Sequence, residues 1–266
     1  MPMITTKRGL KWHYELVGQG ETLLFIHGFG VSSGIWVNQV KDFSSHYQVM
    51  TLDLPGHGGS SWMDVNLNDM AVDIKEILNT LDMHQVNIIG SSLGGLITFK
   101  LFNICPEKLH RAVFVGALPK FAREDYYPAG LDIPKIRKMS DQFQGDYKAI
   151  LDIFFRSLFS RQERESPQFQ LIKNFQKSSP APQRAALLKF LEILEKDDLR
   201  HVLARMPYRV RFINGSEDYI CPGGMVPWLE EHIPHARIDT IQGAGHFPFL
   251  TRPEEFNDLL QGFLMS

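Results

Sequence analysis

The chain has 266 residues, of which 44% are hydrophobic and 22% are charged, so its composition is that of a folded globular protein and not of a disordered or fibrous one. The net charge of −2 argues against a nucleic-acid partner. No apolar run approaches the ~18 residues of a membrane-spanning helix, and residues 1–8 lack the apolar centre of a secretion signal, which predicts a cytoplasmic protein with no membrane attachment.

Short apolar runs predict the strands, and glycine-rich turns follow several of them. Two weak runs near residues 3–6 and 12–16 have no helix between them, so we expect an antiparallel pair at one edge of a sheet. Runs at 23–26 and 47–52 end at His27-Gly28 and at Asp53-Leu54-Pro55-Gly56, as buried strands before loops do. Further strands are expected at residues 86–89, 112–115, 210–213 and 237–241.

Helical patterns alternate with these strands. Apolar residues recur at three-to-four spacing in five segments, near residues 33–43, 67–81, 92–103, 223–232 and 253–264. Strands that alternate with helices require crossover connections, which place helices on both faces of a mostly parallel sheet. The predicted fold class is therefore α/β.

The alternation of strands and helices stops between about residues 118 and 203. This stretch has no convincing strand, and it is rich in phenylalanine (Phe121, Phe143, Phe154, Phe155, Phe159, Phe169, Phe175 and Phe190). We interpret residues 118–203 as a helical cap inserted into a core formed by residues 1–117 and 204–266. Aromatic residues at helical spacing usually form core, but the underside of a cap is also the roof of a site below it, so Phe154 and Phe155 are candidate substrate contacts.

Charge is unevenly distributed along the chain. Between Pro119 and Arg184 there are twelve basic and eight acidic side chains, a local charge of +4 that leaves −6 for the rest of the chain. Two interpretations remain open: the segment is an ordinary solvated helical surface, or it attracts an acidic partner to one face of the protein.

The segment Gly90-Ser91-Ser92-Leu93-Gly94 lies between a predicted strand and a predicted helix. A serine at the apex of so tight a turn needs glycines on both sides, because a Cβ there collides with the strand and the helix. The pattern G-x-S-x-G in this context predicts that Ser92 is a nucleophile. A serine hydroxyl is a poor nucleophile at neutral pH, so it needs a base to remove its proton and a carboxylate to orient that base.

Of the ten histidines, His246 best fits the base. It lies in a glycine-containing loop between the last strand and the last helix, from which an imidazole can reach across the sheet edge. The acid is expected between Ser92 and His246 in the chain, at the end of a strand. Asp218, three positions after Gly215, is our choice, and the adjacent Glu217 stays the alternative.

A developing oxyanion needs hydrogen-bond donors, usually the backbone N–H after the nucleophile and one from the loop after the third strand. In this chain those donors are the N–H groups of Leu93 and Phe29. His27 and His57 adjoin glycine turns, and we interpret both as residues that hold the conformation of their loops.

These motifs, taken in order, resemble those of the α/β-hydrolase superfamily over nearly the full chain. Within it the chain is most similar to the pimeloyl-[acyl-carrier protein] methyl ester esterases of the biotin pathway. The segments that carry this resemblance outside the catalytic motifs are Phe121-Ala122-Arg123-Glu124-Asp125, Leu191-Glu192-Ile193-Leu194, Asp198-Leu199-Arg200, Pro248-Phe249 and Pro253-Glu254-Glu255-Phe256. The resemblance implies hydrolysis of the methyl ester of a pimeloyl chain on an acyl carrier protein, an acidic partner that docks on the basic cap.

Two features depart from the pattern of that family. The family often has tryptophan where this chain has Phe29 and Ser91, which implies an acyl pocket of different shape beside the nucleophile and makes both residues candidate substrate contacts. The arginines of the family's cap are only partly reproduced. Four basic residues in the matching region are the candidate carrier-docking residues: Lys148, Arg156, Arg161 and Arg164.

The leading hypothesis is a serine carboxylesterase that needs neither a metal nor an organic cofactor. Cys105 and Cys221 have no metal-ligand spacing around them, so we expect two reduced structural thiols. The same triad also suits small esters in general, or a carbon–carbon bond cleaved after ketonisation, whereas a serine at position 92 disfavours dehalogenase and epoxide hydrolase chemistry. The fold also serves ligand-binding receptors and silent scaffolds, and a scaffold predicts no ester turnover.

Overall fold

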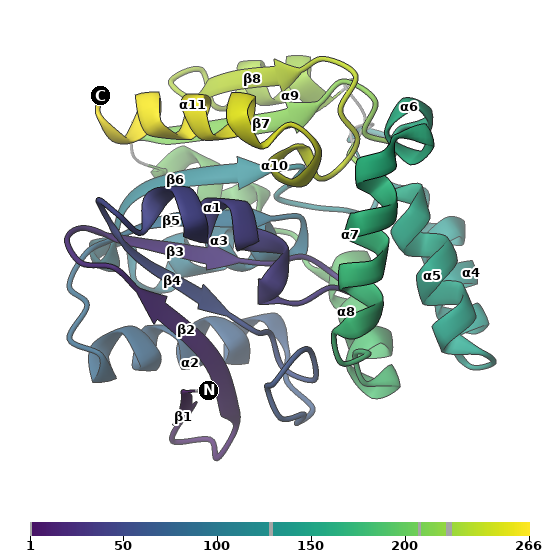
Figure 1. Cartoon of the computed structure of the whole chain (residues 1–266), viewed down its shortest axis with the longest axis horizontal. Coiled ribbons are helices and arrows are strands. Elements are labelled where there is room, and N and C mark those ends of the chain that lie inside the picture. Colours follow the sequence, from purple (N-terminus) through teal and green to yellow (C-terminus); the bar gives the residue numbers. More distant parts are fainter. Residues whose placement is uncertain (1, 128–129, 207–208, 222–224) are drawn as a thin grey trace.

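The computed structural model describes residues 2–127, 130–206, 209–221 and 225–266. Within these residues one eight-stranded sheet forms the centre, in the order β1-β2-β4-β3-β5-β6-β7-β8 (Figure 1). The strands are β1 (Met3–Thr5), β2 (Lys11–Val17), β3 (Thr22–Ile26), β4 (Gln48–Leu52), β5 (Val86–Ser91), β6 (Leu109–Val115), β7 (Val210–Gly215) and β8 (Arg237–Ile241). β2 pairs antiparallel with both β1 and β4, whereas the pairs from β4 to β8 are parallel. The predicted antiparallel edge and mostly parallel sheet are confirmed.

Helices cover both faces of the sheet (Figure 1). One face is covered by α1 (Val37–Phe43), α10 (Pro248–Thr251) and α11 (Pro253–Leu264), the other by α2 (Leu67–Thr80), α3 (Leu93–Ile104) and α9 (Met225–His232). Short 3-10 turns lie at Ser33–Trp36, Pro106–Lys108 and Arg200–Arg205. The helices predicted for the core are present, although residues 223 and 224 of one prediction lie outside the described residues. Helix α10 is too short to give a periodic signal.

Strand β3 shows how the sheet separates two apolar clusters. Leu23 and Phe25 pack in the cluster beneath α1 and α11, whereas Leu24 and Ile26 pack in the cluster beneath α2 and α3. This division follows because successive side chains of a strand point to opposite faces of a sheet. Both faces are covered, so every residue of β3 is buried and its sequence from Leu23 to Ile26 is a continuous apolar run.

A block of helices separates β6 from β7 in the chain and lies at the end of the sheet to which the parallel strands point (Figure 1). Its helices are α4 (Ile133–Phe143), α5 (Tyr147–Ser157), α6 (Arg161–Glu165), α7 (Pro167–Ser178) and α8 (Arg184–Lys196). In the part of this block that the structure describes there are isolated bridges but no strand. We refer to the block as the cap, and its limits at residues 118 and 203 stay a prediction.

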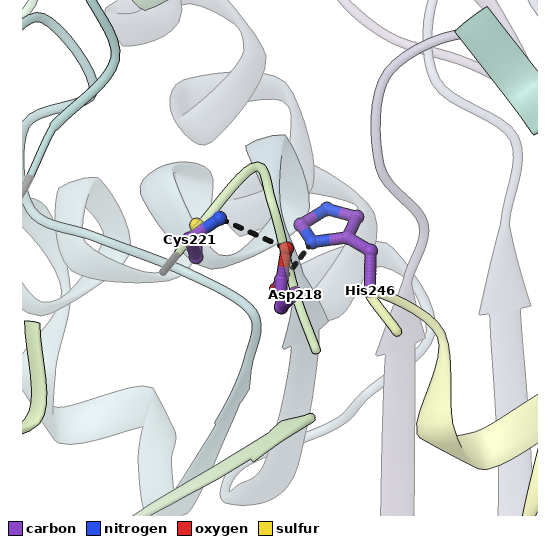
Figure 2. Close-up of side chains that lie close together, drawn as sticks. All are labelled: Asp218, Cys221 and His246. Carbon is purple, nitrogen blue, oxygen red and sulfur yellow. Dashed lines mark hydrogen bonds and ion pairs between the residues drawn. The ribbon is translucent and has the colours of Figure 1, made fainter. Parts of the chain in front are cut away.

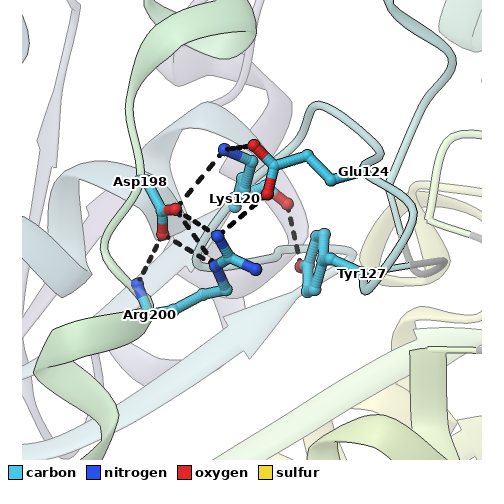
Figure 3. A network of polar contacts seen from close by, with 5 residues as sticks. All are labelled: Lys120, Glu124, Tyr127, Asp198 and Arg200. Carbon is cyan, nitrogen blue, oxygen red and sulfur yellow. Dashed lines mark hydrogen bonds and ion pairs between the residues drawn. The ribbon is translucent and has the colours of Figure 1, made fainter.

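A polar network joins the two ends of the cap (Figure 3). Lys120 pairs with Asp198 in an isolated bridge, and its ammonium lies 3.4 Å from Asp198 and 2.9 Å from Glu124. Arg200 bonds Asp198 and Glu124 at 3.0 Å each and lies over the ring of Tyr127. Burial opposes the ionisation of Asp198, but the hydrogen bonds from Arg200 and the charge of Lys120 outweigh it and lower the pKa of this carboxyl to about 2. The cap therefore leaves and rejoins the sheet through one ionic cluster.

Two further predictions concern the chain as a whole. Among the described helices, none is both long enough and apolar enough to cross a membrane. Cys105 and Cys221 are buried and form no disulfide, so the prediction of two free thiols is confirmed. Burial raises the pKa of the Cys105 thiol to about 11, which keeps it protonated and unreactive at neutral pH.

Candidate active site

Ser92 lies at the turn between β5 and α3, at the position that the pattern G-x-S-x-G predicts. Its backbone has φ 53° and ψ −116°, a conformation that residues with a Cβ rarely adopt. Its N–H donates a hydrogen bond to the carbonyl of Val115 at the end of β6, with an N···O distance of 2.9 Å. The side chain stands at the amino end of α3, where the first N–H groups have no acceptor within the helix.

Three glycines permit this turn because the chain around it is closely packed. A Cβ on Gly94 would lie 2.3 Å from the carbonyl oxygen of Ile26, and a Cβ on Gly95 would lie 2.3 Å from the Cβ of Ala117. A Cβ on Gly90 would lie 2.6 Å from the carbonyl oxygen of Gly94. A Cβ does not approach other heavy atoms so closely in folded proteins, so the strained turn is held by the packing of the sheet and α3 around it.

The predicted acid and base are hydrogen bonded to each other (Figure 2). Nδ1 of His246 and Oδ2 of Asp218 are 2.7 Å apart, and both side chains are buried. The other carboxylate oxygen of Asp218 accepts the backbone N–H groups of Ile220 at 2.8 Å and Cys221 at 2.9 Å. Because a carboxylate only accepts hydrogen bonds, Nδ1 of the imidazole carries the proton and Nε2 is left as the proton acceptor.

The turn after β6 contacts both the serine turn and the histidine–aspartate pair. Val115 accepts the N–H of Ser92, and the next residue, Gly116, has a φ of +51° and lies against the pair. A Cβ on Gly116 would lie 2.8 Å from Nδ1 of His246 and 3.0 Å from Oδ2 of Asp218. The three predicted residues therefore lie around the carboxyl ends of β5 to β8, which are neighbours in the sheet.

Glu217, the alternative acid, occupies a different position. It is half-buried, and its backbone N–H donates to the carbonyl of Ala244 at 2.9 Å. Among the described side chains, the carboxylate that pairs with His246 is that of Asp218. The geometry therefore favours Asp218 as the acid.

The two predicted loop histidines hold the segment that carries Phe29. His27 accepts the N–H of Leu54 at Nε2 over 2.9 Å, and His57 accepts the N–H of Gly30 at Nε2 over 3.3 Å. Burial lowers the pKa of both imidazoles, that of His57 to about 3, so both rings are neutral and accept these bonds at neutral pH. The prediction that both histidines hold loop conformation is confirmed.

The segment that carries Phe29 also lies against the serine. A Cβ on Gly28 would be 3.0 Å from the Cβ of Ser92 and 3.7 Å from its Oγ. In the part of the chain that the structure describes, the N–H of Phe29 has no hydrogen-bond acceptor, and the N–H of Leu93 stands at the first position of α3. Both predicted oxyanion donors therefore belong to segments that flank Ser92.

An apolar cavity of about 180 Å³ opens at Ser92. Phe29 and Phe154 line it, and their rings are in edge-to-face contact at 5.3 Å. The rest of the wall comes mainly from the cap (Phe121, Leu131, Lys135, Ile136, Met139, Leu191 and Leu194) and from the loop of Asp218 (Tyr219 and Ile220). The underside of the cap is therefore the roof of the site.

Two other candidate substrate contacts do not line this cavity. Phe155 is 2% exposed and packs edge-to-face on Phe159. It points away from the cavity that Phe154 lines, because neighbouring residues of a helix point about 100° apart. Ser91 is buried, and its Oγ has no hydrogen-bond partner among the residues described. Of the predicted substrate contacts, Phe29 and Phe154 are the two that meet the cavity at Ser92.

The four candidate docking residues differ in how their charges are used. Arg161 forms an ion pair with Glu165 at 3.0 Å, and Arg164 donates to two carbonyl groups at the end of α5. Lys148 and Arg156 are exposed, and within the described ranges neither forms an ion pair, although the Arg156 guanidinium lies 6.0 Å from the centre of the Phe169 ring. Lys148 and Arg156 are therefore the two candidates whose charges are available to a partner.

One set of contacts to the histidine loop has no counterpart in the sequence predictions. The N–H of His246 donates to the carbonyl of Leu158 in the cap at 2.7 Å, and the N–H of Gly245 donates to the carboxylate of Glu163 at 3.0 Å. The spacing from Ser160 to Glu163 is a capping-box pattern, which predicts where a helix begins but not which segment lies beside it.

Asp218, Cys221 and His246 also bring three potential metal ligands within 4.8 Å of one another (Figure 2). Each of them is already hydrogen bonded, and the Cys221 thiol donates to the carbonyl of Gly116 at 3.0 Å. Burial and the neighbouring Asp218 raise the pKa of that thiol well above its ordinary value, whereas a cysteine ligates a metal as the thiolate. The cluster fits an acid–base pair better than a metal site.

Comparisons with known proteins identify the family of the chain. Residues 21–253 match the family model described as alpha/beta hydrolase fold. The chain is 30% identical over 248 residues to a pimeloyl-[acyl-carrier protein] methyl ester esterase of Nitrosomonas europaea, a match that covers 92% of this chain and 96% of that protein. It is 29% identical over 253 residues to the protein of the same name from Aeromonas hydrophila, covering 94% and 98%.

Solved structures share the fold. An esterase from Exiguobacterium antarcticum superposes with a TM-score of 0.89 at 23% identity, over 99% of both chains. An enol-lactonase from Burkholderia xenovorans superposes with a TM-score of 0.89 at 18% identity, over the whole of both chains. At these identities the likeness is one of fold, and the two names show that the fold serves more than one class of substrate.

Proposed function

Because the chain belongs to the alpha/beta hydrolase fold family, we propose that this hydrolase cleaves carboxylic esters with Ser92 as nucleophile, His246 as base and Asp218 as the acid that orients the base. The observation that carries the proposal is the 2.7 Å hydrogen bond between His246 and Asp218 beside a serine in a strained turn. Asp218 fixes which imidazole nitrogen is free to take a proton.

In the first half of the proposed reaction, Oγ of Ser92 attacks the ester carbonyl carbon and its proton passes to Nε2 of His246. Asp218 stabilises the imidazolium that forms. The charge on the carbonyl oxygen is stabilised by the N–H groups of Phe29 and Leu93, each worth about 3 kcal/mol in sites of this kind. His246 then gives its proton to the departing alcohol as the ester C–O bond breaks, which leaves an acyl-serine.

In the second half, water repeats the sequence against the acyl-serine. Nε2 of His246 takes a proton from the water as the water oxygen attacks the acyl carbon, and the bond to Ser92 breaks as the serine oxygen regains a proton from His246. One ester and one water are consumed, and one acid and one alcohol are released. These steps use side chains and backbone N–H groups alone, with no metal or organic cofactor in the balance.

The proposed substrate is the methyl ester of a pimeloyl chain carried on an acyl carrier protein, in the context of biotin synthesis. Relatives at 29–30% identity carry that activity in their names. An apolar cavity at Ser92 suits an acyl chain, and the charge of +4 between Pro119 and Arg184 suits an acidic carrier. Lys148 and Arg156 are the foremost docking candidates, followed by Arg161 and Arg164.

The test is hydrolysis of pimeloyl methyl ester on acyl carrier protein beside the same ester free of carrier, at matched concentrations. We expect kcat/KM to be at least about 10-fold higher for the carrier-bound ester, and the preference to shrink as salt is added. Equal or lower activity on the carrier would overturn the substrate assignment. No hydrolysis of either ester above a Ser92→Ala control would overturn the esterase itself.

A general short-chain carboxylesterase is the second candidate. It is favoured by Phe29, which lines the cavity at a position where the resembled family often has tryptophan. A series of p-nitrophenyl esters with acyl chains of increasing length decides between the candidates, because this one predicts the highest kcat/KM for the shortest chains. A receptor or scaffold predicts no turnover in the whole series.

A further inference from the structure

The cap is hydrogen bonded to the loop that carries His246, through the turn between α5 and α6. The hydroxyl of Ser160 donates to the carbonyl of Gly243 at 3.0 Å. The N–H of His246 donates to the carbonyl of Leu158 at 2.7 Å. The loop of the proposed base is therefore held from the cap side as well as from Asp218.

Glu163 supplies a further bond across the same contact, from an environment that is costly for a carboxylate. Its Oε2 accepts the N–H of Gly245 at 3.0 Å and the N–H of Ser160 at 2.7 Å. The side chain is 3% exposed, and among the described residues its Oε1 has no hydrogen-bond partner and no lysine or arginine pairs with it. A buried carboxylate without a cation is destabilising unless its hydrogen bonds compensate.

Helix capping alone does not require this burial. The bond between Glu163 and Ser160 completes a capping box, a motif that glutamine serves as well and that needs no desolvated charge. The carboxylate also reaches the residue before His246, in a contact so close that a Cβ on Gly245 would lie 2.8 Å from Oε2 of Glu163. This second contact distinguishes Glu163 from an ordinary capping residue.

We propose that Glu163 is a positioning residue for His246, an inference that rests on the proposed function. His246 must keep Nε2 at one place through two rounds of proton transfer, and Asp218 restrains only the opposite side of the ring. Glu163 restrains the backbone that bears the ring, through the N–H of Gly245. A base displaced by a fraction of an ångström slows proton transfer more than it weakens substrate binding, so the loss falls on kcat.

Three substitutions separate this role from a contribution to folding. Glu163→Gln keeps an acceptor oxygen at the same reach, Glu163→Asp keeps the charge but shortens the reach, and Glu163→Ala removes both. With p-nitrophenyl butyrate we expect kcat to fall about 10-fold to 100-fold in the Asp and Ala variants, with KM within about 3-fold of the parent. Glu163→Gln should stay within about 5-fold of the parent kcat. The matched control is Glu165→Ala, which removes an exposed carboxylate from the same helix and should leave kcat unchanged.

A readout independent of turnover is the downfield proton NMR signal of the Nδ1–H between His246 and Asp218, assigned by its loss in Asp218→Ala. We expect the signal to shift or broaden in Glu163→Asp and Glu163→Ala and to be retained in Glu163→Gln. Parent kcat and an unchanged signal in both the Asp and Ala variants would overturn the proposal, as would a loss confined to KM.

The two proposals fail in distinguishable ways. A parent protein with no ester turnover removes the proposed function, and the NMR comparison still decides whether Glu163 positions the imidazole. If circular dichroism shows that Glu163→Ala does not fold, Glu163→Asp carries the test, because it keeps the charge and the capping oxygen in the same helix.

Discussion

Two parts of the proposed catalytic apparatus are held in place by different means. The serine turn, residues 90–95, is fixed by close packing, since a Cβ on Gly94 would lie 2.3 Å from the carbonyl oxygen of Ile26. The histidine loop, residues 243–246, is also closely packed, since a Cβ on Gly215 would lie 2.0 Å from the carbonyl oxygen of Gly245, but it is in addition hydrogen bonded to Asp218 on one side and to the cap on the other. In the part of the chain that the structure describes, the turn of the proposed nucleophile is therefore held by the sheet and α3, whereas the loop of the proposed base is held by the sheet and the cap together.

This difference indicates which catalytic residue a change in the cap would affect. Close packing leaves no room for even one additional methyl group, so the serine turn is either intact or disrupted. Hydrogen bonds lengthen and weaken gradually, so the bonds between the cap and the histidine loop respond by degrees to a change in the cap. A change in the cap is therefore expected to act on His246 while Ser92 stays in place.

The largest effect is expected where the two parts act as one unit. Ser92→Ala and His246→Ala should each lower kcat on p-nitrophenyl butyrate by about 10³-fold or more, because each residue is useless without the other. The double variant should be no slower than either single variant. Circular dichroism checks that the fold is intact, and turnover near the parent rate in either variant would contradict the triad.

The packing of the serine turn is broken most directly by Gly94→Ala. The added Cβ meets backbone, which has little freedom to move, so the free energy of unfolding should fall by about 3 kcal/mol or more. Gly262→Ala in α11 is the matched control, because a Cβ there has no heavy atom within 4 Å. The control should raise the free energy of unfolding by about 0.5–1 kcal/mol. Urea denaturation measures both, and a Gly94→Ala protein as stable as the parent would show that packing does not hold the turn.

The segment of Phe29 is linked to the cap through His57. The imidazole of His57 accepts the N–H of Gly30 and stacks on the ring of Phe190 in α8 at 5.1 Å. Burial lowers the pKa of His57 from 6.5 to about 3, so below pH 6.5 the unfolded chain binds a proton that the folded protein does not. The contribution of the neutral His57 to the free energy of unfolding is therefore fully present above pH 6.5 and is lost as the pH falls toward 3. Between pH 7 and pH 5 the free energy of unfolding should fall by about 2 kcal/mol from His57.

Urea denaturation at the two pH values measures this dependence, and substitutions assign it. His57→Gln should lose the part of the pH dependence that belongs to His57, although it lowers stability at both pH values. His84→Gln, at a side chain that is 81% exposed, is the control and should keep the parent's dependence. A His57→Gln protein with the same pH dependence as the parent would show that His57 is not the group that titrates.

The smallest effect is expected from surface charge on the cap. Lys148→Glu and Arg156→Glu should lower kcat/KM for the carrier-bound ester by about 3-fold to 10-fold and leave p-nitrophenyl butyrate unaffected. Lys11→Glu, on β2, is the control and should change neither rate. Equal losses of kcat/KM on both substrates would mean that these charges act on the catalytic residues. The exposed surface of the cap would then not be independent of the catalytic site.

The serine turn and the Asp218–His246 pair could be predicted from the sequence because their signals are local. The glycines around Ser92 stand at fixed spacing, and Asp218 follows Gly215 by three residues at the end of a strand. Short-range constraints of this kind leave a readable pattern in the chain.

The contacts of the cap could not be predicted in the same way. Glu163 and Gly245 are 82 residues apart in the chain, and no local pattern encodes their contact. Phe154 and Phe155 are neighbours on one helix and point in different directions, so Phe154 lines the cavity and Phe155 does not. The spacing of apolar residues does not show which of the two faces the cavity. In the sequence, the segments around Glu124 and Asp198 stand out only because they resemble the esterase family. Their contact in the ionic cluster of the cap depends on the fold.

The ionic cluster at the base of the cap has a consequence for how such proteins diversify. Lys120 and Asp198 are 78 residues apart in the chain and yet contact each other, so a long excursion begins and ends at nearly one point of the sheet. A segment with coincident ends can be lengthened, shortened or exchanged without moving the strands that carry it. The cap can thus be exchanged as a unit. A replacement cap must supply new side chains above the substrate cavity and also an acceptor for the N–H of Gly245.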